Sequence, residues 1–227
     1  MGDKSTLNIG VLAVQGSFEE HVRALEGISK TSSDYNINVF EVRCSEDIRE
    51  NMQGLILPGG ESTTLSVFFK DEGFYAKIKE WASDESKFVM GTCMGMILLS
   101  NNVQDQKAGG QIKIGGIDIT VARNHYGRQL HSFETKLSLE GPDFPEVDSH
   151  PSFHGIFIRA PGIISINNPG TVTILASFLH PETREKEVVG VRQGRLLACS
   201  FHPELTPDVR FHQYFANIIF EGEKMQK

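Results

Sequence analysis

The stretch FVMGTCMGMILLS, residues 88–100, places a cysteine between two glycines where one apolar run ends and another begins. Residues 87–92 have the length and composition of a buried strand, and the segment after the cysteine begins a helix. Cys93 then lies on the turn between strand and helix. Gly91 and Gly95 allow a strained turn and close packing of the helix on the strand. This pattern, G-x-nucleophile-x-G, predicts that the sulfur of Cys93 is lifted out of the sheet, at a helix N-terminus that favours a thiolate.

Around this turn, the first hundred residues alternate short apolar runs with amphipathic segments. The apolar runs have the length of strands, and the amphipathic segments have the spacing of helices. Strands that are apolar along their whole length and separated by helices form parallel sheets covered on both faces. The expected strands are 7–15, 37–42, 54–59 and 87–92, and the expected helices are 17–29, 45–51, 61–71 and 73–84. We therefore predict an α/β fold with an open, mostly parallel sheet flanked by helices.

Beyond about residue 111 the pattern changes to strands joined by tight turns, which adds antiparallel strands to the sheet. The segment 139–153 holds three prolines and is expected to be a surface loop. A helix over 206–222, started by Thr206 and Pro207, is expected to close the chain. The expected strands of this half are 114–123, 128–139, 171–178 and a hairpin over 187–201 that turns at Gln193 and Gly194. With no repeat and no linker, residues 1–227 are expected to form a single domain.

The composition argues against several classes of partner. The 227 residues include 22 lysines and arginines against 29 aspartates and glutamates, a net charge of −7, with no basic block that could follow a phosphate backbone. We therefore expect no nucleic-acid partner. The N-terminus lacks the basic start and unbroken apolar core of a signal peptide, and no stretch reaches the roughly 18 apolar residues of a membrane span. We expect a cytoplasmic protein that does not contact a membrane.

The cysteines and histidines do not have the spacing of a disulfide framework or a zinc site. Cys44, Cys93 and Cys199 are an odd number and widely spaced. Free cysteines are more often structural than catalytic, and we expect Cys44 and Cys199 to be structural because they lack the glycines that flank Cys93. His150 and His154 form an H-x-x-x-H pair, but the pair straddles a proline beside a loop and lacks a third ligand. We expect neither a metal site nor a cofactor.

A cysteine nucleophile needs a base, and the tripeptide His-Pro-Glu occurs twice, at 180–182 and at 202–204. In an extended segment residues i and i+2 face the same side, so either glutamate can accept a hydrogen bond from its own histidine. The first copy lies in a charged connection between hairpin strands, which is typical of a solvated turn. The second copy ends an apolar strand, where open α/β sheets gather their chemistry. We predict that His202 and Glu204 serve Cys93 and that the first copy is a surface turn.

Several motifs together resemble the class I (triad) glutamine amidotransferases and, more narrowly, the family of glutaminase subunits of pyridoxal 5'-phosphate synthase. They are GVLAVQGSFEEH (10–21), PGGEST (58–63), GTCMGMILLS (91–100), RNHYGRQLHSFE (123–134), FIRAP (157–161) and FHPELTPDVRFHQYF (201–215). The resemblance spans nearly the whole chain, leaving 30–36 and 142–152 as apparent insertions, and it implies a flavodoxin-like sheet. One departure is Met94, where this family has alanine, so we expect a bulkier pocket wall.

The resemblance implies hydrolysis of the side-chain amide of L-glutamine. Cys93 attacks this amide, and the backbone N–H groups of Met94 and Gly60 hold the resulting oxyanion. His202 protonates the departing ammonia, and Glu204 orients the imidazole ring. Water then hydrolyses the γ-glutamyl thioester.

The resemblance also implies a set of glutamine-binding residues. They are Gly60, Glu61, Ser62, Arg123, Ile158 and Arg159. A guanidinium group suits the α-carboxylate of glutamine, and the alternative for both arginines is an ordinary surface charge. The alternative for the PGGES glycines is a plain turn between strand and helix. Gln15 and His21 are either contacts to a partner subunit, or a polar strand end and an exposed helix position.

The partner that the resemblance implies is a (β/α)8-barrel synthase subunit, which receives the ammonia directly. Because glycine tolerates both signs of φ, the Gly59–Gly60 peptide can rest with no donor aimed at the substrate. We predict that docking of the synthase, near Gln15 and residues 19–23, selects the productive orientation.

Two other functions stay open. One is a different enzyme on the same fold, either another class I glutaminase or a γ-glutamyl peptidase, which the motif content disfavours. The other is a non-catalytic regulatory subunit, which the intact set of Cys93, His202 and Glu204 disfavours.

Overall fold

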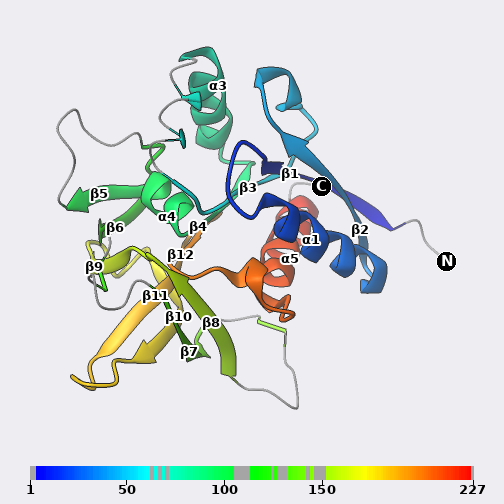
Figure 1. Cartoon of the computed structure of the whole chain (residues 1–227). Helices are drawn as coiled ribbons and strands as arrows, with labels where there is room; N and C mark the ends of the chain where they lie inside the picture. The colour runs from blue at the N-terminus through cyan, green and yellow to red at the C-terminus, as the bar shows by residue number, and fades with distance from the viewer. Residues whose placement is uncertain are drawn as a thin grey trace.

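The N-terminal half of the chain folds as strands alternating with helices, in the order expected from its sequence. The structure is a computed structural model and describes residues 4–61, 64–65, 68–69, 72–104, 113–123, 125–126, 132–141, 144–145 and 152–225. The elements of this half are β1 (Ser5–Leu12), α1 (Phe18–Thr31), β2 (Tyr35–Val42), η1 (Ser45–Asp47), β3 (Gly54–Leu57), α3 (Glu72–Ser83), β4 (Phe88–Thr92) and α4 (Met94–Leu99). Strands β2, β1, β3 and β4 lie side by side in that order and all pair in parallel, as Figure 1 allows the reader to follow.

The C-terminal half supplies the fifth parallel strand and the antiparallel part of the sheet. Its elements are β5 (Ser100–Gln104), β6 (Ile117–Ala122), β7 (Ser132–Leu139), β8 (Ser152–Ile158), β9 (Gly162–Ile166), β10 (Thr173–Leu179), β11 (Lys186–Gln193), β12 (Leu196–Cys199), η2 (Pro203–Leu205) and α5 (Arg210–Met225). Strand β12 pairs with β4 in parallel, which gives the order 2-1-3-4-12 of a flavodoxin-like sheet. Strands β11, β10, β7 and β8 continue the sheet in antiparallel fashion. The predicted α/β class with added antiparallel strands is confirmed.

A second, three-stranded sheet was not predicted. The segment 114–123 was expected to join the main sheet, but its strand β6 pairs in parallel with β5 and in antiparallel fashion with β9. Helix α4 ends after six residues, and the chain continues directly into β5. On β6, Ile117, Ile119 and Val121 are fully buried, so this strand turns its apolar face toward the core beside α4.

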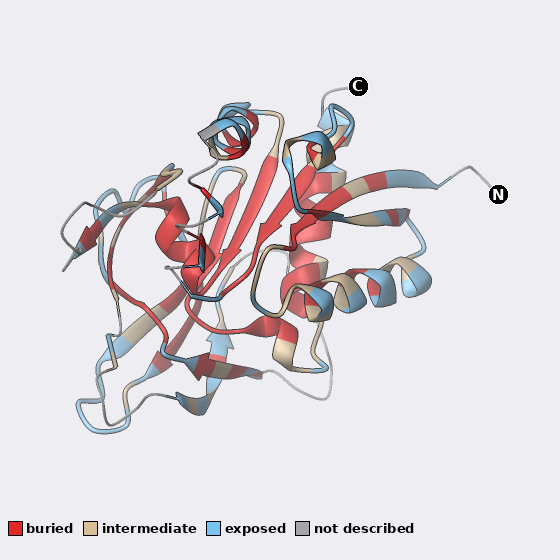
Figure 2. Ribbon diagram, turned by 45° about the horizontal axis from the view of Figure 1, so that its top comes forward, coloured by how far each residue is buried: buried red, intermediate tan, exposed pale blue. Residues whose placement is uncertain are grey.

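Two groups of buried side chains cover the two faces of the main sheet. Helices α1 and α5 pack with Ile56 and Met90 on one face. Helices α3 and α4 and the small sheet pack with Leu57 and Val89 on the other face. Alternate residues of β3 and β4 thus point to opposite sides, as strand geometry requires. Figure 2 shows the consequence, because the central strands β3, β4 and β12 are buried along their whole length.

Two predicted helices differ from the structure. The helix expected over 45–51 is only the single turn η1: the carboxylate of Asp47 caps its start by accepting the backbone N–H groups of Arg43 and Cys44, but the chain is extended again at Ile48. The closing helix α5 begins at Arg210 rather than at Thr206 and Pro207.

Local hydrogen bonds explain the late start of α5. The hydroxyl of Thr206 accepts the N–H of Asp208 at 3.3 Å, and the carboxylate of Asp208 accepts the N–H of Arg210 at 3.1 Å. These side chains hold a separate turn before the helix, as serine, threonine and aspartate commonly do.

Some expected features lie partly or wholly outside the described residues. They include most of the helix over 61–71, most of the loop over 139–153, and His150. The other member of the excluded histidine pair, His154, contacts the carboxylate of Glu134 at 2.9 Å, and both side chains are more than half exposed. Along the described residues, no helix is long and apolar enough to cross a membrane.

Candidate functional site

The turn that carries Cys93 connects β4 to α4. Cys93 has φ 50° and ψ −103°. Residues other than glycine rarely adopt this backbone conformation, and it stores strain. A Cβ atom on Gly95 would lie 2.0 Å from the carbonyl oxygen of Leu57, and one on Gly91 would lie 2.4 Å from the carbonyl oxygen of Gly95. No side chain fits at either position, so the predicted packing of helix on strand requires both glycines.

His202 approaches Cys93 from the end of the neighbouring strand. Because β12 and β4 are parallel neighbours, their carboxyl ends lie at the same edge of the sheet. The backbone N–H of Cys93 donates to the carbonyl oxygen of Cys199 at 2.8 Å. Gly59 lies against both side chains, since a Cβ atom on it would be 2.6 Å from Cε1 of His202 and 3.1 Å from Cβ of Cys93. The segments after β3, β4 and β12 therefore converge.

Glu204 holds the ring of His202. Nδ1 of His202 and Oε1 of Glu204 are 2.8 Å apart, and both side chains are less than a tenth exposed. Burial lowers the pKa of His202, but the hydrogen bonds and charges of Cys93 and Glu204 outweigh burial and raise the pKa to about 10. At neutral pH the ring is protonated and can donate from Nδ1 to Glu204 and from Nε2 toward Cys93. Such an imidazolium can protonate a leaving amine.

The other His-Pro-Glu tripeptide lies on the turn between β10 and β11. Glu182 is exposed. Nδ1 of His180 accepts the backbone N–H groups of Glu182 and Thr183 at 3.3 and 3.2 Å. The ring of His180 therefore shapes its own turn, whereas the ring of His202 contacts the Cys93 segment.

The two predicted oxyanion donors, Gly60 and Met94, follow the segments that meet at Cys93. Gly60 has φ 148°, a value that favours glycine. The side-chain amide of Gln15 lies against it, because a Cβ atom on Gly60 would be 2.6 Å from Cδ of Gln15. Both polar atoms of this amide are buried without a hydrogen-bond partner among the described residues. The side chain of Met94 is 3% exposed and packs in the core on the α3 side of the sheet, so its bulk is taken up there.

The predicted glutamine-binding residues are only partly gathered. The carbonyl oxygen of Ile158 is 3.9 Å from Sγ of Cys93. The guanidinium of Arg159 pairs with Glu61 at 3.1 Å, and both side chains are about two-thirds exposed. Arg123 is half-buried after the end of β6, and Ser62 lies outside the described residues. Ile158 therefore lies beside Cys93, and the residue that follows it, Arg159, pairs with Glu61.

One expectation about a site residue is wrong. His21 was considered an exposed helix position or a partner contact, but it is fully buried and lies behind the His202–Glu204 pair. Its spacing carried the signal, because His21, Leu25 and Ile28 follow the i, i+4, i+7 pattern of one helix face, and all three are buried. Sequence reasoning also missed two buried neighbours of His21, Thr92 and His212.

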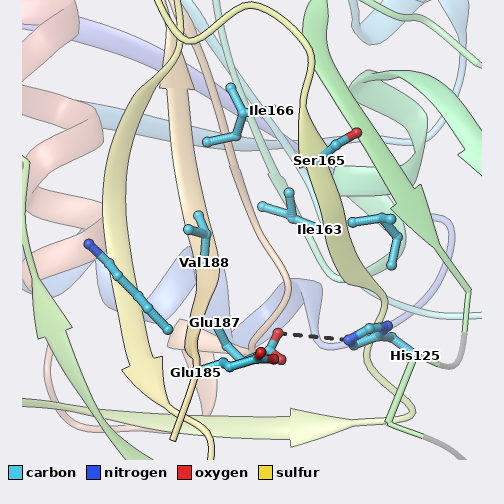
Figure 3. A pocket seen from close by; sticks show the side chains of 9 residues that line it. His125, Ile163, Ser165, Ile166, Glu185, Glu187 and Val188 are labelled. Carbon is cyan, nitrogen blue, oxygen red and sulfur yellow. Dashed lines mark ion pairs between the residues drawn. The ribbon is translucent and has the colours of Figure 1, made fainter. Parts of the chain in front are cut away.

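A separate pocket of about 460 Å³ lies between β9 and β11, and none of the predicted site residues lines it (Figure 3). Ile163, Ile166 and Val188 form its apolar side. At its edge, Nε2 of His125 lies 3.7 Å from a carboxylate oxygen of Glu187. The pocket is thus a feature apart from the Cys93 turn.

Comparison with known proteins agrees with this arrangement. The profile of the SNO glutamine amidotransferase family matches residues 11–221. The probable pyridoxal 5'-phosphate synthase subunit pdx2 of Dictyostelium discoideum is 40% identical, with 97% of this chain and 95% of that protein covered. The pyridoxal 5'-phosphate synthase subunit PdxT of Oenococcus oeni is 39% identical, with 96% and 100% covered. A crystal structure of a glutamine amidotransferase matches with a TM-score of 0.75 and 36% identity, covering 93% of this chain and 98% of that one. The protein belongs to the SNO glutamine amidotransferase family.

Proposed function

We propose that this protein is the glutaminase subunit of a pyridoxal 5'-phosphate synthase. It hydrolyses L-glutamine to L-glutamate and ammonia and passes the ammonia to the synthase subunit for vitamin B6 synthesis. The observation that carries the proposal is the strained Cys93 turn beside the buried pair of His202 and Glu204. The relatives, each named a subunit of pyridoxal 5'-phosphate synthase, support the narrower assignment.

Cys93 is the nucleophile of this reaction. Its thiolate attacks the side-chain amide carbon of glutamine, and the carbonyl electron pair moves onto oxygen. Protonated His202 gives its proton to the amide nitrogen, which leaves as ammonia when the C–N bond breaks. Water, deprotonated by His202, then attacks the γ-glutamyl thioester and releases glutamate, which restores the thiolate and the imidazolium. Glu204 orients the ring and stabilises its positive charge.

The backbone N–H groups of Met94 and Gly60 stabilise the oxyanion. The N–H of Met94 begins α4 and has no partner within the helix, so it is free to donate. The orientation of the Gly59–Gly60 peptide decides whether Gly60 donates as well. Removing one such donor typically lowers kcat by about 10²- to 10³-fold, so this peptide is a suitable control point.

We infer that glutamine is bound by Gly60, Glu61, Ser62, Arg123, Ile158 and Arg159, of which Ser62 lies outside the described residues. The pair of Glu61 and Arg159 supports this assignment, because its two charges are complementary to the α-ammonium and α-carboxylate groups of an amino acid. Since both side chains are well exposed, the pair can open at little energetic cost and exchange its internal contact for contacts to the substrate.

The partner is a (β/α)8-barrel synthase subunit that docks beside the Gly59–Gly60 peptide. Gln15 supports this location, because its buried amide lies against Gly60 and has no hydrogen-bond partner among the residues described. A docked subunit that moves Gln15 would also move Gly60. We also infer that residues 1–227 are a single domain, which the one main sheet beneath both core groups supports. The cytoplasmic location stays a prediction from the sequence.

Replacement of the nucleophile tests this function. In the complex with a synthase subunit, Cys93→Ala should release no glutamate from glutamine, yet should still support synthesis from added ammonium salts. Cys44→Ala, a matched change at an exposed cysteine, should keep full activity. Acid-quenched wild-type protein incubated with glutamine should carry a glutamyl group on the peptide that contains Cys93. Substantial glutamate release by Cys93→Ala, or an adduct on another cysteine instead, would overturn the assignment.

A further inference from the structure

Two histidines that the proposed reaction does not use are fully buried behind His202 and Glu204. His21 lies near the start of α1, and His212 lies near the start of α5. Nδ1 of His21 and Nε2 of His212 are 2.8 Å apart. The two helices that carry them lie side by side (Figure 1). Each ring is therefore fixed by packing against its neighbour and by one short polar contact.

His21 faces the carboxylate oxygen of Glu204 that His202 does not use. Nε2 of His21 is 3.4 Å from Oε2 of Glu204, and both side chains are 0% exposed. Oε1 of the same carboxylate is held by His202. Within the described residues, Oε2 has no hydrogen-bond partner of ordinary geometry. A buried carboxylate oxygen without a donor is strongly disfavoured, so the nearby ring nitrogen of His21 is the group that can satisfy it.

The protonation state of His21 follows from its surroundings. Burial, followed by the nearby His212 and His202, lowers the pKa of His21 well below its ordinary value. Burial also lowers the pKa of His212 to about 4. Both rings are neutral at neutral pH, and each has one N–H and one bare nitrogen. A bare nitrogen opposite the unpartnered Oε2 of Glu204 would set two lone pairs against each other, whereas an N–H is attracted. His21 therefore carries its proton on Nε2.

This choice also fixes the proton of His212. With its proton on Nε2, His21 presents a bare Nδ1, which accepts a hydrogen bond. The atom 2.8 Å away, Nε2 of His212, must then be the N–H that donates. Nδ1 of His212 is left bare, and it has no hydrogen-bond partner in the part of the chain that the structure describes. The donors run in one direction, from His212 to His21 and from His21 to Glu204.

His21 also contacts the segment of the predicted oxyanion hole. Its Nε2 is 3.4 Å from the hydroxyl oxygen of Thr92. The same hydroxyl accepts the backbone N–H of Gly59 at 3.1 Å. The buried ring of His21 therefore contacts both Glu204 and Thr92, and Thr92 holds the Gly59–Gly60 segment through its hydrogen bond with Gly59.

We propose that His21 is a positioning residue for glutamine hydrolysis: held in one tautomer by His212, it donates its Nε2–H to Oε2 of Glu204 and keeps that carboxylate aimed at His202. This inference rests on the proposed function, because the carboxylate acts through His202 and Cys93.

Paired substitutions at His21 test the inference in the complex with a synthase subunit. His21→Phe keeps an aromatic ring but removes the donor, and it should lower kcat for glutamine hydrolysis on the order of 10- to 100-fold, the effect expected when a charged group loses a hydrogen bond. KM should stay unchanged because His21 does not touch the substrate. His21→Gln, whose side-chain amide places an N–H near the position of Nε2, should recover most of the rate.

His212 provides a second pair of variants. His212→Phe should lower kcat by less than His21→Phe, and His212→Gln, which keeps a donor, should be close to the wild type. Since His212 acts through His21, the double variant His21→Phe/His212→Phe should be no slower than His21→Phe alone. Ile219→Ala removes buried side chain from the same helix without touching these rings, and it should lower the unfolding temperature while leaving kcat unchanged.

A readout that needs neither glutamine nor a partner separates this inference from the proposed function. The rate at which iodoacetamide alkylates Cys93, followed on its peptide by mass spectrometry because Cys44 is exposed, should fall in His21→Phe and recover in His21→Gln. An inactive wild-type complex would overturn the glutaminase assignment, while this alkylation pattern would still support the role of His21. Equal rates for His21→Phe and wild type, or equal losses for the Phe and Gln variants, would overturn the inference. If His21→Phe does not fold, the comparison of His212→Phe with His212→Gln decides: a lower kcat for the Phe variant alone supports the inference, and equal kcat values for the two variants overturn it.

Discussion

At the residue scale, His202 is set apart from the other histidines by its two partners. Glu204 contacts Nδ1 at 2.8 Å, and Cys93 contributes a further hydrogen bond and charge that help raise the pKa of the ring to about 10 against the opposing effect of burial. His180, in an identical tripeptide, receives only backbone N–H groups of its own turn. The chain therefore contains a matched internal control for the role of the base.

His202→Asn should lower the rate of glutamine hydrolysis by at least about 10²- to 10⁴-fold, the contribution of a positioned general acid and base. His180→Asn should be close to neutral, because it changes only a surface turn. Steady-state glutamate production by both variants, with a synthase subunit present, is the measurement. Similar losses from the two variants, or a larger loss from His180→Asn, would show that the wrong copy has been assigned.

Much of the site was predictable at this scale because its residues lie in short sequence motifs. The glycines on either side of Cys93 and the His-Pro-Glu spacing each describe a turn of a few residues. His21 was singled out but not expected to be buried, and His212 was not singled out, although their helical spacing puts both on buried faces. Their role depends on α1 and α5 packing together, and this contact between distant segments has no local signal.

At the element scale, the junction of β4 and α4 tolerates no side chain at its glycines. The nearest atom to a Cβ on Gly95 would be the carbonyl oxygen of Leu57 in β3, at 2.0 Å. Because this atom belongs to the backbone of a buried strand, it cannot move aside as the end of a flexible side chain could. The position of the Cys93 turn is therefore fixed by β3, β4 and α4 together.

Gly95→Ala should destabilise the fold and remove glutaminase activity, because α4 must move away from β3. Gly27→Ala is a matched control in α1, since a Cβ on Gly27 would meet nothing within 4 Å and alanine favours a helix by about 1 kcal/mol over glycine. Thermal unfolding and glutamate release should show loss for the first variant, and unchanged activity with equal or higher stability for the second. A stable, active Gly95→Ala protein would contradict the packing described here.

The elements that sequence alone missed share a physical cause. In both cases an aspartate caps a short turn: Asp47 caps the start of η1, and Asp208 accepts the N–H of Arg210, which a helix started at Thr206 would have used. Aspartate also favours the first turn of a helix, so the same residue type is compatible with both outcomes. The residue type alone therefore does not predict where the helix begins or ends.

At the scale of the whole molecule, the parallel order of β2, β1, β3 and β4 followed from alternating strands and helices. The small sheet of β5, β6 and β9 was not predicted. Strands β5 and β9 lie far apart in the sequence, and the residue pattern of a strand does not show which other strand it pairs with. The family resemblance covered both halves of the chain, and the family is confirmed.

Stability should depend on pH through the buried histidines. Burial lowers the pKa of His212 to about 4 from an ordinary value of 6.5, so the unfolded chain binds a proton that the native state excludes. This contribution is present above pH 6.5 and is lost as pH falls through 6.5 toward 4, on the order of 2 kcal/mol by about pH 5. Urea unfolding should show a smaller loss between about pH 7 and about pH 5 for His212→Gln than for the wild type. Equal losses would contradict a neutral, buried His212.

The central claim is that this protein is a glutaminase whose activity is controlled by its synthase partner. Ammonia released into solvent would be protonated and lost as a nucleophile, so hydrolysis is useful only when the partner is bound. The most direct measurement is steady-state glutamate production at saturating glutamine, titrated with a synthase subunit. We predict a weak rate for the isolated chain that rises about 10²- to 10³-fold with the partner, the effect of gaining one oxyanion donor at Gly60. A rate that is already high in isolation and does not respond to the synthase would contradict the claim.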